Sequence, residues 1–479
     1  MPLPDDRSGD AVHDPYAVTL DTLRTTFRSG RTHGLDWRRE QLQALRRMMS
    51  EHREALSAAA SQDIGKPRPE AELAEVFTVV QEVDALLDNL ERWTGSRKVR
   101  LPLTFQPATA RLQHRPKGVL LVIGPWNYPV QLLLSPLAGA LAAGNTVLLK
   151  PSEVAPAVSS LVADLVPRYL DPEAVAVVEG GAAEATALLA HRFDHVVFTG
   201  SQRVGRIVMR AAAEHLTPVT LELGGKSPVF VDASVHLRTV AQRLVWGKFL
   251  NVGQTCVAPD YVMVTPEVHD ALVDELRRAI RAAFGRDPRR SSDYGRVVND
   301  LHFDRLLGLL EGTDPVIGGE HERSERYLAP TVVTGVGLDH ALMQEEIFGP
   351  VLPVLRVAGV TEALEVVEAN PHPLSFYVFS EDAQVRSRFE EESLSGALAF
   401  NLPVAHQSAP GLPFGGVGGS GFGRYHGEHS IQEFSHERPV LSKPLRPDTL
   451  AMLYPPSTRW KRLVNDRVLT RLMGVRKDA

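Results

Sequence analysis

Residues 118 to 150 read GVLLVIGPWNYPVQLLLSPLAGALAAGNTVLLK, and this stretch decides the fold. It has no charged residue before its last position, and a run of this length could cross a bilayer as one helix. Pro125, Pro129 and Pro136 interrupt it, and an interior proline removes a helical N–H and clashes with the preceding turn. We therefore expect a buried strand (GVLLVIG), a loop (PWNYP), a short helix (PLAGALAAG) and a second buried strand (NTVLLK).

The rest of the chain also alternates between helical and extended patterns. Apolar strands such as HVVFTG, VTLEL and PVFVD follow helical stretches to about residue 232, and a second block of this kind runs from about 225 to 400. Residues 18 to 95 have the apolar spacing of helices, whereas residues 97 to 117 alternate and are rich in proline, which indicates extended arms. The predicted fold class is α/β, with parallel sheets covered by helices.

The composition is that of a soluble globular protein with more than one domain. A chain of 479 residues exceeds what a single core usually supports, and 43% hydrophobic with 23% charged residues are ordinary values. The net charge of −6 gives no general attraction to nucleic acid or anionic membranes. One cysteine cannot form an internal disulfide, and the polar N-terminus lacks the apolar segment of a secretory signal. We expect a cytoplasmic protein without a nucleic-acid partner.

The only cysteine, Cys256, lies in NVGQTCVAPDY, residues 251 to 261. A structural thiol usually has apolar neighbours, because a neutral thiol behaves as a small hydrophobe. Gly253, Gln254 and Thr255 instead indicate an irregular polar turn, where a thiol has room to meet a substrate. The residues alone leave two interpretations open, a reactive thiol and a buried structural thiol.

Two further segments place a polar side chain beside a buried strand. In PWNYP, Asn127 follows a strand at the end where open α/β sheets bind ligands, so its amide is a candidate donor to an oxyanion, with a turn asparagine as the alternative. In TPVTLELGGKSP, Glu222 lies between two leucines. Burial would raise the pKa of this carboxyl toward that of a general base, whereas an edge strand would leave it in water. Gly224 and Gly225 favour burial, because paired glycines indicate a close backbone approach.

The segment FTGSQRVG, residues 198 to 205, predicts a strand, a Gly-Ser turn and a helix that begins near Gln202. Free N–H groups at a helix start favour a phosphate. Gly200 and Gly205 are present, but the central glycine of the G-x-G-x-x-G fingerprint is absent. A dinucleotide site and a simple capped helix both fit this segment.

Seven motifs follow one another along the chain: PWNYP, LLKPSE, FTGSQRVG, VTLELGGKSP, GQTC, EEIFGP and PFGGVGGSG. With this combination the chain resembles the NAD(P)-dependent aldehyde dehydrogenase superfamily over nearly its whole length. The stretches SGRTHGLDWRREQLQAL, MQEEIFGPVLP, FSHERP and YPP are most similar to class 3, the group with fatty and aromatic aldehyde dehydrogenases. Coniferyl-aldehyde dehydrogenases share much of this pattern.

The resemblance implies oxidation of a medium- or long-chain aliphatic or an aromatic aldehyde to the carboxylic acid. Cys256 would attack the aldehyde carbon, and Asn127 with the N–H of Cys256 would stabilise the oxyanion. Hydride transfer to the nicotinamide would then leave a thioester, which is easily hydrolysed. Glu222 would activate the water, which favours a free acid over an acyl-CoA or acyl phosphate product.

The resemblance also implies a site for NAD. Lys150 and Glu153 would meet the adenosine ribose, and Glu346 would hold the nicotinamide ribose. NADP stays open as a second cofactor, although Glu153 should repel a 2′-phosphate. The implied cofactor contacts are Trp126, Lys150, Glu153, Gly200, Ser201, Gly205, Leu223, Gly224, Glu346 and Phe348.

The implied architecture is a doubly wound Rossmann-type cofactor domain, an α/β catalytic domain and a β-arm for dimerisation. Exposed strand edges invite pairing between copies, and class 3 members are typically dimers, so we expect a homodimer. The predicted boundaries are 1–96 with 118–222 for the cofactor-binding domain, 223–425 for the catalytic domain, 97–117 with 426–446 for the oligomerisation arms, and 447–479 for a C-terminal tail.

The tail has helical spacing of apolar residues and an excess of basic ones. A basic amphipathic helix can lie on an anionic membrane surface, so peripheral membrane contact is one prediction. The alternative is a helix packed on its own dimer, over the partner's substrate entrance. The residues that carry the spacing are Trp460, Leu463, Val464, Arg467, Val468 and Leu472.

Two other functions remain as alternatives. A thiol esterase would use Cys256 and Glu222 without a cofactor, so cofactor dependence separates it from a dehydrogenase. A catalytically silent scaffold would keep only the fold, and the presence of Cys256, Glu222 and Asn127 together argues against it. No metal site is expected, because the sequence has no H-E-x-x-H motif and no Cys/His cluster.

Overall fold

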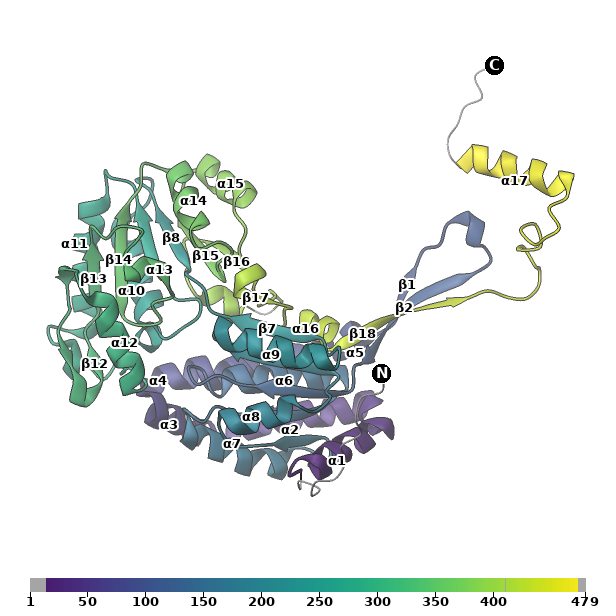
Figure 1. The fold of residues 1–479 in the computed structure, drawn as a ribbon, viewed down its shortest axis with the longest axis horizontal. Coiled ribbons are helices and arrows are strands. Elements are labelled where there is room, and N and C mark those ends of the chain that lie inside the picture. The colour runs from purple at the N-terminus through teal and green to yellow at the C-terminus, as the bar shows by residue number, and fades with distance from the viewer. Residues whose placement is uncertain (1–13, 410, 473–479) are drawn as a thin grey trace, which may run out of the picture. The chain divides into compact units, whose positions relative to one another are not determined.

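The computed structural model describes residues 14–409 and 411–472, which form two compact units (Figure 1). The first unit consists of the described parts of Met1–Trp93 and Pro116–His436. The second consists of Thr94–Arg115 and the described part of Glu437–Ala479. The first unit contains two large sheets, and the second contains a small sheet and a helix.

The first large sheet has the strand order β5-β4-β3-β6-β7-β17. Its first five strands are parallel, and β17 joins the edge in the antiparallel direction. The chain thus starts in the middle at β3 and builds outward on both sides, which is the order of a doubly wound sheet. The strands are β3 (Val119–Ile123), β4 (Thr146–Lys150), β5 (Val175–Val177), β6 (His195–Gly200), β7 (Val219–Leu223) and β17 (Gly421–Phe422).

Helices occupy most of residues 17–94, as the helical spacing of residues 18 to 95 predicts, and further helices connect the strands of this sheet. A π-helical segment, Glu72–Phe77, joins two of them. The helices are α1 (Ala17–Arg28), α2 (Leu35–Glu51), α3 (Arg53–Ile64), α4 (Arg68–Ala71), α5 (Thr78–Thr94), α6 (Gln131–Ala143), α7 (Pro156–Tyr169), α8 (Ala182–Leu189), α9 (Gln202–Glu214) and, later in the chain, α16 (Glu428–Glu433).

Each face of the first sheet has its own apolar core. On β3, Leu120 and Val122 pack with residues of α2, α5, α6 and α7, whereas Leu121 packs on the opposite face with residues of α1, α8 and α9. Successive side chains of a strand point to opposite faces, so a sheet with both faces covered needs an unbroken apolar run. This confirms the buried strand predicted from GVLLVIG.

Helix α6 is longer than the sequence pattern predicts. The prolines suggest a helix from Pro136 onward, but α6 begins at Gln131 and holds Pro136 in its interior. All of its residues are buried, and the N–H groups of Val130 and Gln131 donate to the carboxylate of Glu75. Packing and this side-chain contact at the helix start offset the hydrogen bond that the proline removes.

The second large sheet has the order β10-β13-β14-β9-β8-β15-β16, and only the β10–β13 pair is antiparallel. Apolar residues of α10 and α11 pack on one face, and those of α14 and α15 on the other. The strands are β8 (Pro228–Val231), β9 (Tyr261–Val264), β10 (Pro315–Ile317), β13 (Thr331–Thr334), β14 (Val351–Arg356), β15 (Ser375–Phe379) and β16 (Ala397–Phe400). The helices are α10 (Leu237–Phe249), α11 (His269–Phe284), α12 (Asp300–Leu310), α13 (Ala341–Gln344), α14 (Val360–Glu368) and α15 (Ala383–Glu392), and a ribbon of β11 (His321–Glu322) and β12 (Tyr327–Leu328) lies between α12 and β13 in the chain.

Two of the predicted boundaries differ from the structure. The range 223–425 contains β17, which returns to the first sheet and pairs with β7. Residue 426 is too early a start for the arm, because α16 packs against α6 in the first unit and the later segment of the second unit begins at Glu437. The functions assigned to these domains stay predictions.

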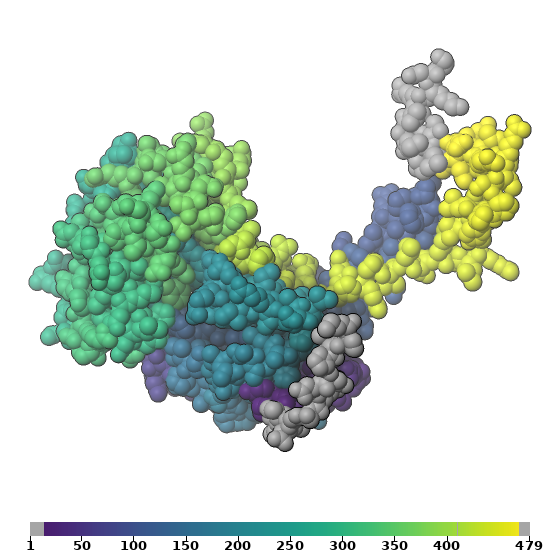
Figure 2. All heavy atoms as spheres, in the orientation of Figure 1, coloured from purple at the N-terminus to yellow at the C-terminus, as the bar shows by residue number. Residues whose placement is uncertain are grey.

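The second unit is built on a three-stranded sheet with the order β1-β2-β18. Residues 97–117 contain two strands, as the prediction of extended arms implies, but a 3-10 turn at Leu103–Phe105 lies between them. Lys443 donates to the main-chain oxygens of Phe105 and Gln106 at 3.0 and 3.1 Å. Taken by itself, this unit is narrow in Figure 2. Its elements are β1 (Arg97–Val99), β2 (Thr109–Pro116), β18 (Ser435–Ser442) and α17 (Arg459–Leu472).

Helix α17 confirms the helix predicted from the spacing in the tail. Trp460, Leu463 and Val468 expose between 46% and 64% of their surface. Within residues 14–409 and 411–472, no helix has both the length and the apolar character to cross a membrane. The same described residues contain no group of three or more His, Cys, Asp or Glu side chains that could hold a metal ion.

Two helical glycines provide a matched test of this packing. A Cβ at Gly139 in α6 would lie 2.6 Å from Cβ of Ser430 in α16, whereas a Cβ at Gly308 in α12 would meet nothing within 4 Å. We expect Gly139→Ala to lower the free energy of unfolding by about 1–3 kcal/mol through overpacking. Gly308→Ala should raise it by about 0.5–1 kcal/mol through helix propensity. Urea unfolding of both variants checks this, and equal effects would contradict it.

Candidate active site

The catalytic candidates lie where the two large sheets of the first unit face each other. Loops at the carboxyl ends of β3, β6 and β7 meet loops at the amino ends of β8, β9 and β14. Three contacts join them. Nδ2 of Asn127 donates to the main-chain oxygen of Gln254 at 3.1 Å, the Trp126 and Phe348 rings are 5.5 Å apart, and Gly224 lies against the carboxylate of Glu346.

The loop before Cys256 has an unusual backbone. Asn251, Val252 and Gly253 have φ values of 49°, 56° and 74°, all in the left-handed region. A Cβ at Gly253 would collide with the main-chain oxygen of Gly349, so only glycine fits there. Consecutive left-handed residues are costly and persist only where the surroundings fix them, which is typical of functional sites.

Gln254 fixes this loop through its side chain. Its Nε2 donates to the main-chain oxygens of Asn251 and Arg296, both at 3.1 Å, and its Oε1 accepts from the N–H of Val298 at 2.9 Å. After the cysteine, the Tyr377 hydroxyl donates to the main-chain oxygen of Val257 at 2.6 Å. The backbone around the thiol is therefore held on both sides.

The Cys256 thiol is partly exposed and has two carboxyl groups nearby. Burial raises its pKa well above the ordinary value, and Glu346 and Glu222 raise it further. The thiol is therefore neutral in this form of the protein. Its proton must move to a base as it attacks, since the thiolate is the nucleophile.

Asn127 is buried at the end of β3. An amide nitrogen carries two hydrogens, and one donates to Gln254, which leaves the other for a ligand. The main-chain oxygen of Asn127 accepts from Nζ of Lys66 at 3.1 Å and from Nδ2 of Asn251 at 3.0 Å. This side chain is thus a fixed donor rather than a flexible turn residue.

A buried ion pair supports the Asn127 loop. Nζ of Lys66 lies 2.6 Å from Oε1 of Glu75, and neither side chain is exposed. Oε2 of Glu75 accepts the N–H groups of Val130 and Gln131 at the start of α6, and Nζ of Lys66 lies 3.7 Å above the Tyr128 ring. Lys66 therefore contacts the PWNYP loop itself, and Glu75 fixes the residues that directly follow it.

Glu222 is buried in β7, between Thr199 of β6 and Gly421 of β17. Neither carboxylate oxygen has a hydrogen-bond partner in the described part of the chain, and the same holds for the nearby Tyr425 hydroxyl. Burial raises the pKa of Glu222 well above its ordinary value, and repulsion from Glu433 adds to this. A carboxyl with free lone pairs and a raised pKa has the properties of a general base. The edge-strand alternative is wrong.

Glu346 and Phe348 lie on a loop that a second buried ion pair supports. Nζ of Lys226 lies 2.5 Å from Asp260 and donates to the main-chain oxygen of Glu345 at 2.8 Å, and Asp260 accepts the N–H of Ile347 at 3.1 Å. Burial and the charge of Asp260 raise the pKa of Glu346 to about 8. This carboxyl is therefore largely protonated at neutral pH.

The remaining predicted cofactor residues cluster at the carboxyl ends of β4, β6 and β7. Ser201 is the N-cap of α9 and accepts the N–H of Val204, so this helix starts directly after β6 as predicted. A Cβ at Gly205 would lie 2.6 Å from the Leu223 side chain, so this glycine allows α9 to pack closely on β7. Lys150, at the end of β4, pairs with Glu153 at 2.9 Å.

These residues fit a dinucleotide. The start of α9 lies beside the point where the sheet order reverses between β3 and β6, and the free N–H groups of a helix start favour a phosphate there. Trp126 and Phe348 form an aromatic wall, to which His302 adds at 5.2 Å from Trp126. Lys150 and Glu153 form a hydrogen bond with each other at the end of β4, and neither one contacts the Cys256 loop through this bond.

Several residues that support the site do not stand out in the sequence. Lys66, Glu75, Lys226 and Asp260 are charged residues that the structure buries, and Gln254 is the polar residue that fixes the cysteine loop. Lys226 and Asp260 each lie next to an apolar strand, where a charged residue is a weak sign of a buried pair. Nothing in the spacing of Lys66 and Glu75 indicates that they meet.

These features define a class of protein. A doubly wound sheet with a glycine-lined helix start at its switch point is the architecture of a dinucleotide-dependent oxidoreductase. A thiol beside a fixed amide donor and a buried, unpartnered carboxyl is an arrangement for covalent catalysis at a carbonyl carbon.

The aldehyde dehydrogenase family model matches residues 19–440, and the chain belongs to this family. It is 44% identical to aldehyde dehydrogenase family 3 member A2 from Macaca fascicularis, over 92% of this chain and 91% of that one. It is also 44% identical to the dimeric, NADP-preferring aldehyde dehydrogenase from Rattus norvegicus, over 92% of this chain and 97% of that one.

The solved structures agree with this. The substrate-bound state of AldH from Staphylococcus aureus has a TM-score of 0.91 and 39% identity, and the match covers 94% of this chain and 99% of that one. The resemblance to class 3 drawn from the motifs is therefore confirmed, as is the α/β fold class. The chain is an NAD(P)-dependent aldehyde oxidoreductase, and the esterase and scaffold alternatives are not favoured.

The Lys66–Glu75 pair can be tested with Glu75→Gln. The variant keeps the side-chain size but removes the carboxylate that is hydrogen-bonded to the buried ammonium of Lys66, which usually costs about 3–5 kcal/mol. The control is Asp84→Asn, in the exposed pair with Arg46, where the expected loss is about 0–1 kcal/mol. Urea unfolding measures both, and a Glu75→Gln variant as stable as the control would contradict the supporting role.

The raised pKa of Glu346 predicts a pH-dependent stability difference. The carboxyl titrates at about 8 in the folded chain, above its ordinary value of 4.5. The stability that this carboxyl contributes is therefore fully present below pH 4.5 and is lost as the pH rises through about 8. Relative to the wild type, Glu346→Gln should gain stability progressively from about pH 5 to 8 and then level off. Melting temperatures across this range check it, and a constant or opposite difference would refute it.

Proposed function

We propose that this enzyme converts aldehydes to carboxylic acids with Cys256 as nucleophile, Asn127 as oxyanion donor and Glu222 as general base. The observation that carries the proposal is the state of Glu222. Its two oxygens are buried without a partner, and its charge acts on the Cys256 thiol. A buried polar group without a hydrogen bond is costly, so such a group calls for an explanation in function.

The first step forms a bond between Sγ of Cys256 and the aldehyde carbon. The thiol proton passes to Glu222, whose free lone pairs can accept it. The carbonyl oxygen becomes an oxyanion, which accepts the second N–H of Asn127 and the main-chain N–H of Cys256. Since Asn127 is already fixed by Gln254 and Lys66, its amide needs no reorganisation during the step.

When bound, the nicotinamide supplies the acceptor for the hydride that leaves the former aldehyde carbon. Cys256 then carries a thioester. Glu222 first releases the thiol proton to the solvent. It then takes a proton from a water molecule while the water oxygen attacks the thioester carbon, and the C–S bond breaks to release the acid and the thiolate. The raised pKa of Glu222 makes it a stronger base than an exposed glutamate.

For the cofactor we propose NAD first, with NADP as a second one. Glu153 is half exposed and pairs with Lys150, so it leaves a carboxylate at the predicted ribose position. Like charge would oppose a 2′-phosphate there. Gly200, Ser201 and Gly205 would approach the pyrophosphate, and Trp126, Leu223, Gly224, Glu346 and Phe348 would surround the nicotinamide half.

For the substrate we propose medium- or long-chain aliphatic and aromatic aldehydes, coniferaldehyde included. The resemblance of SGRTHGLDWRREQLQAL and MQEEIFGPVLP to class 3 supports this range. Oxidation rates along a series from acetaldehyde to dodecanal, with benzaldehyde and coniferaldehyde, separate the fatty from the aromatic preference.

The mechanism can be tested through absorbance at 340 nm. Cys256→Ala should abolish cofactor reduction, because no thiohemiacetal forms. Glu222→Gln should lower turnover by about 100-fold or more, in the first turnover as well as in later ones, because both the thiol attack and the thioester hydrolysis lose their base. Glu214→Gln, an exposed glutamate of α9, is the control and should match the wild type. Full activity of the Cys256→Ala variant would refute the proposed role of Cys256.

We further propose a cytoplasmic homodimer that uses the β1-β2-β18 sheet to pair with its partner. Both outer strands of this small sheet, β1 and β18, have a free edge within the described chain. The name of the rat relative, a dimeric enzyme, also supports a dimer. The exposed apolar residues of α17 would then be covered by the partner subunit, and a membrane surface is the alternative cover.

The assembly can be tested on the full chain and on a form that lacks residues 457–479. For the full chain, light scattering at micromolar concentration should give a particle mass that is twice the 52.5 kDa of a single chain. Neither form should pellet with anionic liposomes. A monomeric full chain would refute the dimer, and pelleting of the full chain alone would favour membrane contact.

A further inference from the structure

The second large sheet has a crevice that the catalytic site does not use. Strands β9 and β14 are neighbours, and the helices that follow them leave to opposite faces (Figure 1). Helix α11 packs with α10 on one face, and α14 packs on the other. Where neighbouring parallel strands send their connections to opposite sides, a crevice opens at their carboxyl ends, and open α/β sheets bind ligands there.

This crevice lies at the far end of the strands from the catalytic loops. Cys256 precedes β9 and Glu346 precedes β14, so both lie at the amino ends. His269 follows β9 and Arg356 ends β14, so both lie at the carboxyl ends. A ligand in the crevice would therefore not occupy the catalytic site.

A cavity of about 610 Å³ lies at the carboxyl ends of β9 and β14, and we call it the switch-point cavity. It is formed by the first turns of α11 and α14, the end of β14 and the segment 334–338 after β13. Its volume is within the range of small-molecule sites, about 300–1,000 Å³. The cavity is thus large enough for one ligand of moderate size.

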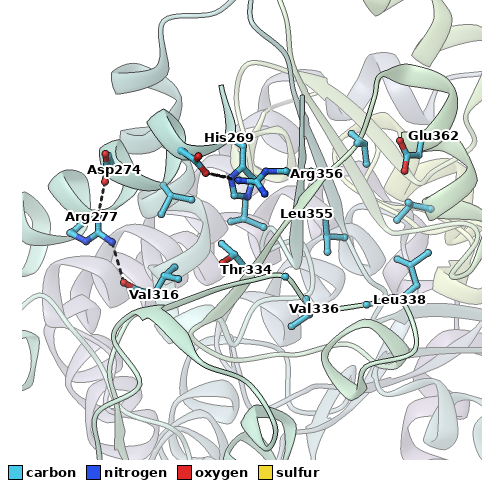
Figure 3. A pocket seen from close by; sticks show the side chains of 17 residues that line it. His269, Asp274, Arg277, Val316, Thr334, Val336, Leu338, Leu355, Arg356 and Glu362 are labelled. Carbon is cyan, nitrogen blue, oxygen red and sulfur yellow. Dashed lines mark hydrogen bonds and ion pairs between the residues drawn. The ribbon is translucent and has the colours of Figure 1, made fainter. Parts of the chain in front are cut away.

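Figure 3 shows His269, Arg277 and Arg356 toward one end of the cavity, which we call its polar end, whereas the carboxylate of Glu362 lies near the opposite end. Arg356 donates to Oδ1 of Asp270 at 2.7 Å, and Nδ1 of His269 lies 2.7 Å from the same oxygen. Arg277 pairs with Asp274 at 2.6 Å. The polar end thus already holds a carboxylate, that of Asp270, between a guanidinium and an imidazole.

A ligand carboxylate can replace Asp270 at low cost. The Asp270 side chain is 85% exposed and that of Arg356 is 56% exposed, and exposed ion pairs contribute little to stability. His269 and Arg356 both lower the pKa of Asp270, which shows that this pair of side chains favours an ionised carboxylate. The guanidinium also presents two parallel N–H groups, which match the two oxygens of a carboxylate.

The other wall of the cavity is aliphatic. Val336 and Leu338 lie away from Arg277 in Figure 3, and no Phe, Tyr or Trp side chain lines the cavity. The carboxylate of Glu362 on this side accepts the N–H of Ala358 at 2.6 Å. Leu338 keeps 44% of its surface exposed. An aliphatic wall without rings fits a hydrocarbon chain better than a planar aromatic group.

We propose that the switch-point cavity binds a medium-chain monocarboxylate, with its carboxylate on Arg356 and His269 and its hydrocarbon chain against Val336, Leu338 and Leu355. The site is argued from the cavity alone and does not depend on the proposed catalytic roles. Acids of this class are also what the oxidation of an aliphatic aldehyde releases.

The test is calorimetric titration with sodium decanoate of the full chain alkylated at Cys256, the only cysteine. Alkylation, verified by mass, closes the catalytic site, so any remaining saturable binding lies elsewhere. We expect one decanoate per chain. Butyrate, which lacks the long chain, and decyltrimethylammonium, which lacks the carboxylate, should each bind at least tenfold more weakly.

Two variants locate the site. Arg356→Gln removes the guanidinium and Leu338→Asp places a charge on the exposed part of the apolar wall, and each should weaken decanoate binding at least tenfold. Arg278→Gln is the control, because this arginine lies on α11 outside the cavity and should bind within twofold of the wild type. Aldehyde oxidation by the unalkylated variants, compared with the wild type, verifies that each one folds.

The proposal fails if the alkylated wild type shows no saturable binding. It also fails if both variants bind decanoate as Arg278→Gln does, or if the cationic amphiphile binds as well as decanoate. Loss of all binding upon alkylation would assign decanoate to the catalytic site alone. None of these outcomes depends on whether Glu222 and Asn127 have the proposed roles.

Discussion

The catalytic site depends on the ion pair between Lys66 and Glu75, which is completely shielded from water. The free-energy cost of removing two charges from water exceeds their mutual attraction unless further hydrogen bonds satisfy the charged groups. Here those further bonds reach the main-chain oxygen of Asn127 and the start of α6. The pair therefore sets geometry more than stability. Lys226 and Asp260 do the same for the loop of Glu346, so each sheet presents its polar groups from a rigid support.

The site contains more acidic groups than it can ionise at once. Cys256, Glu222 and Glu346 each have a raised pKa, with burial as the largest cause. Because their charges repel, ionisation of one group suppresses that of the others, and their protons titrate as a set. Lys248 is buried nearby, and burial lowers its pKa to about 8, so it adds only a fractional positive charge. A positive charge that enters the site would shift this balance toward the thiolate.

Much of the fold could be predicted from the sequence, because local rules dominate it. The run GVLLVI needs both faces of a sheet covered, and Ser201 with Gln202 begins a helix directly after β6. Helix α6 shows the limit of such rules. Pro136 argues for a later start, and only the tertiary contact from Glu75 explains why the helix begins at Gln131.

The candidate site also has a part that the sequence predicts and a part that it does not. Cys256, Asn127 and Glu222 stand out because each has the wrong polarity for its surroundings, and the structure joins their loops through Gln254 and burial. The supporting groups could not be found, because Lys66 and Glu75 look like ordinary helix-surface charges in the sequence. Their pairing is fixed by the packing of distant segments, and no local pattern carries that information.

The positions of Cys256 and Glu346 along the chain have a consequence for how this enzyme can change. Each lies the same number of residues before the start of its strand, and these strands, β9 and β14, are hydrogen-bonded neighbours. Adjacent strands are about 4.8 Å apart, so the sheet acts as a ruler that spaces the two loops. Substitutions within either loop keep this spacing. An insertion or deletion in one loop shifts its side chain, Cys256 or Glu346, along the strand direction relative to the other. Variation that preserves catalysis should therefore alter residue identity in these two loops and leave their lengths unchanged.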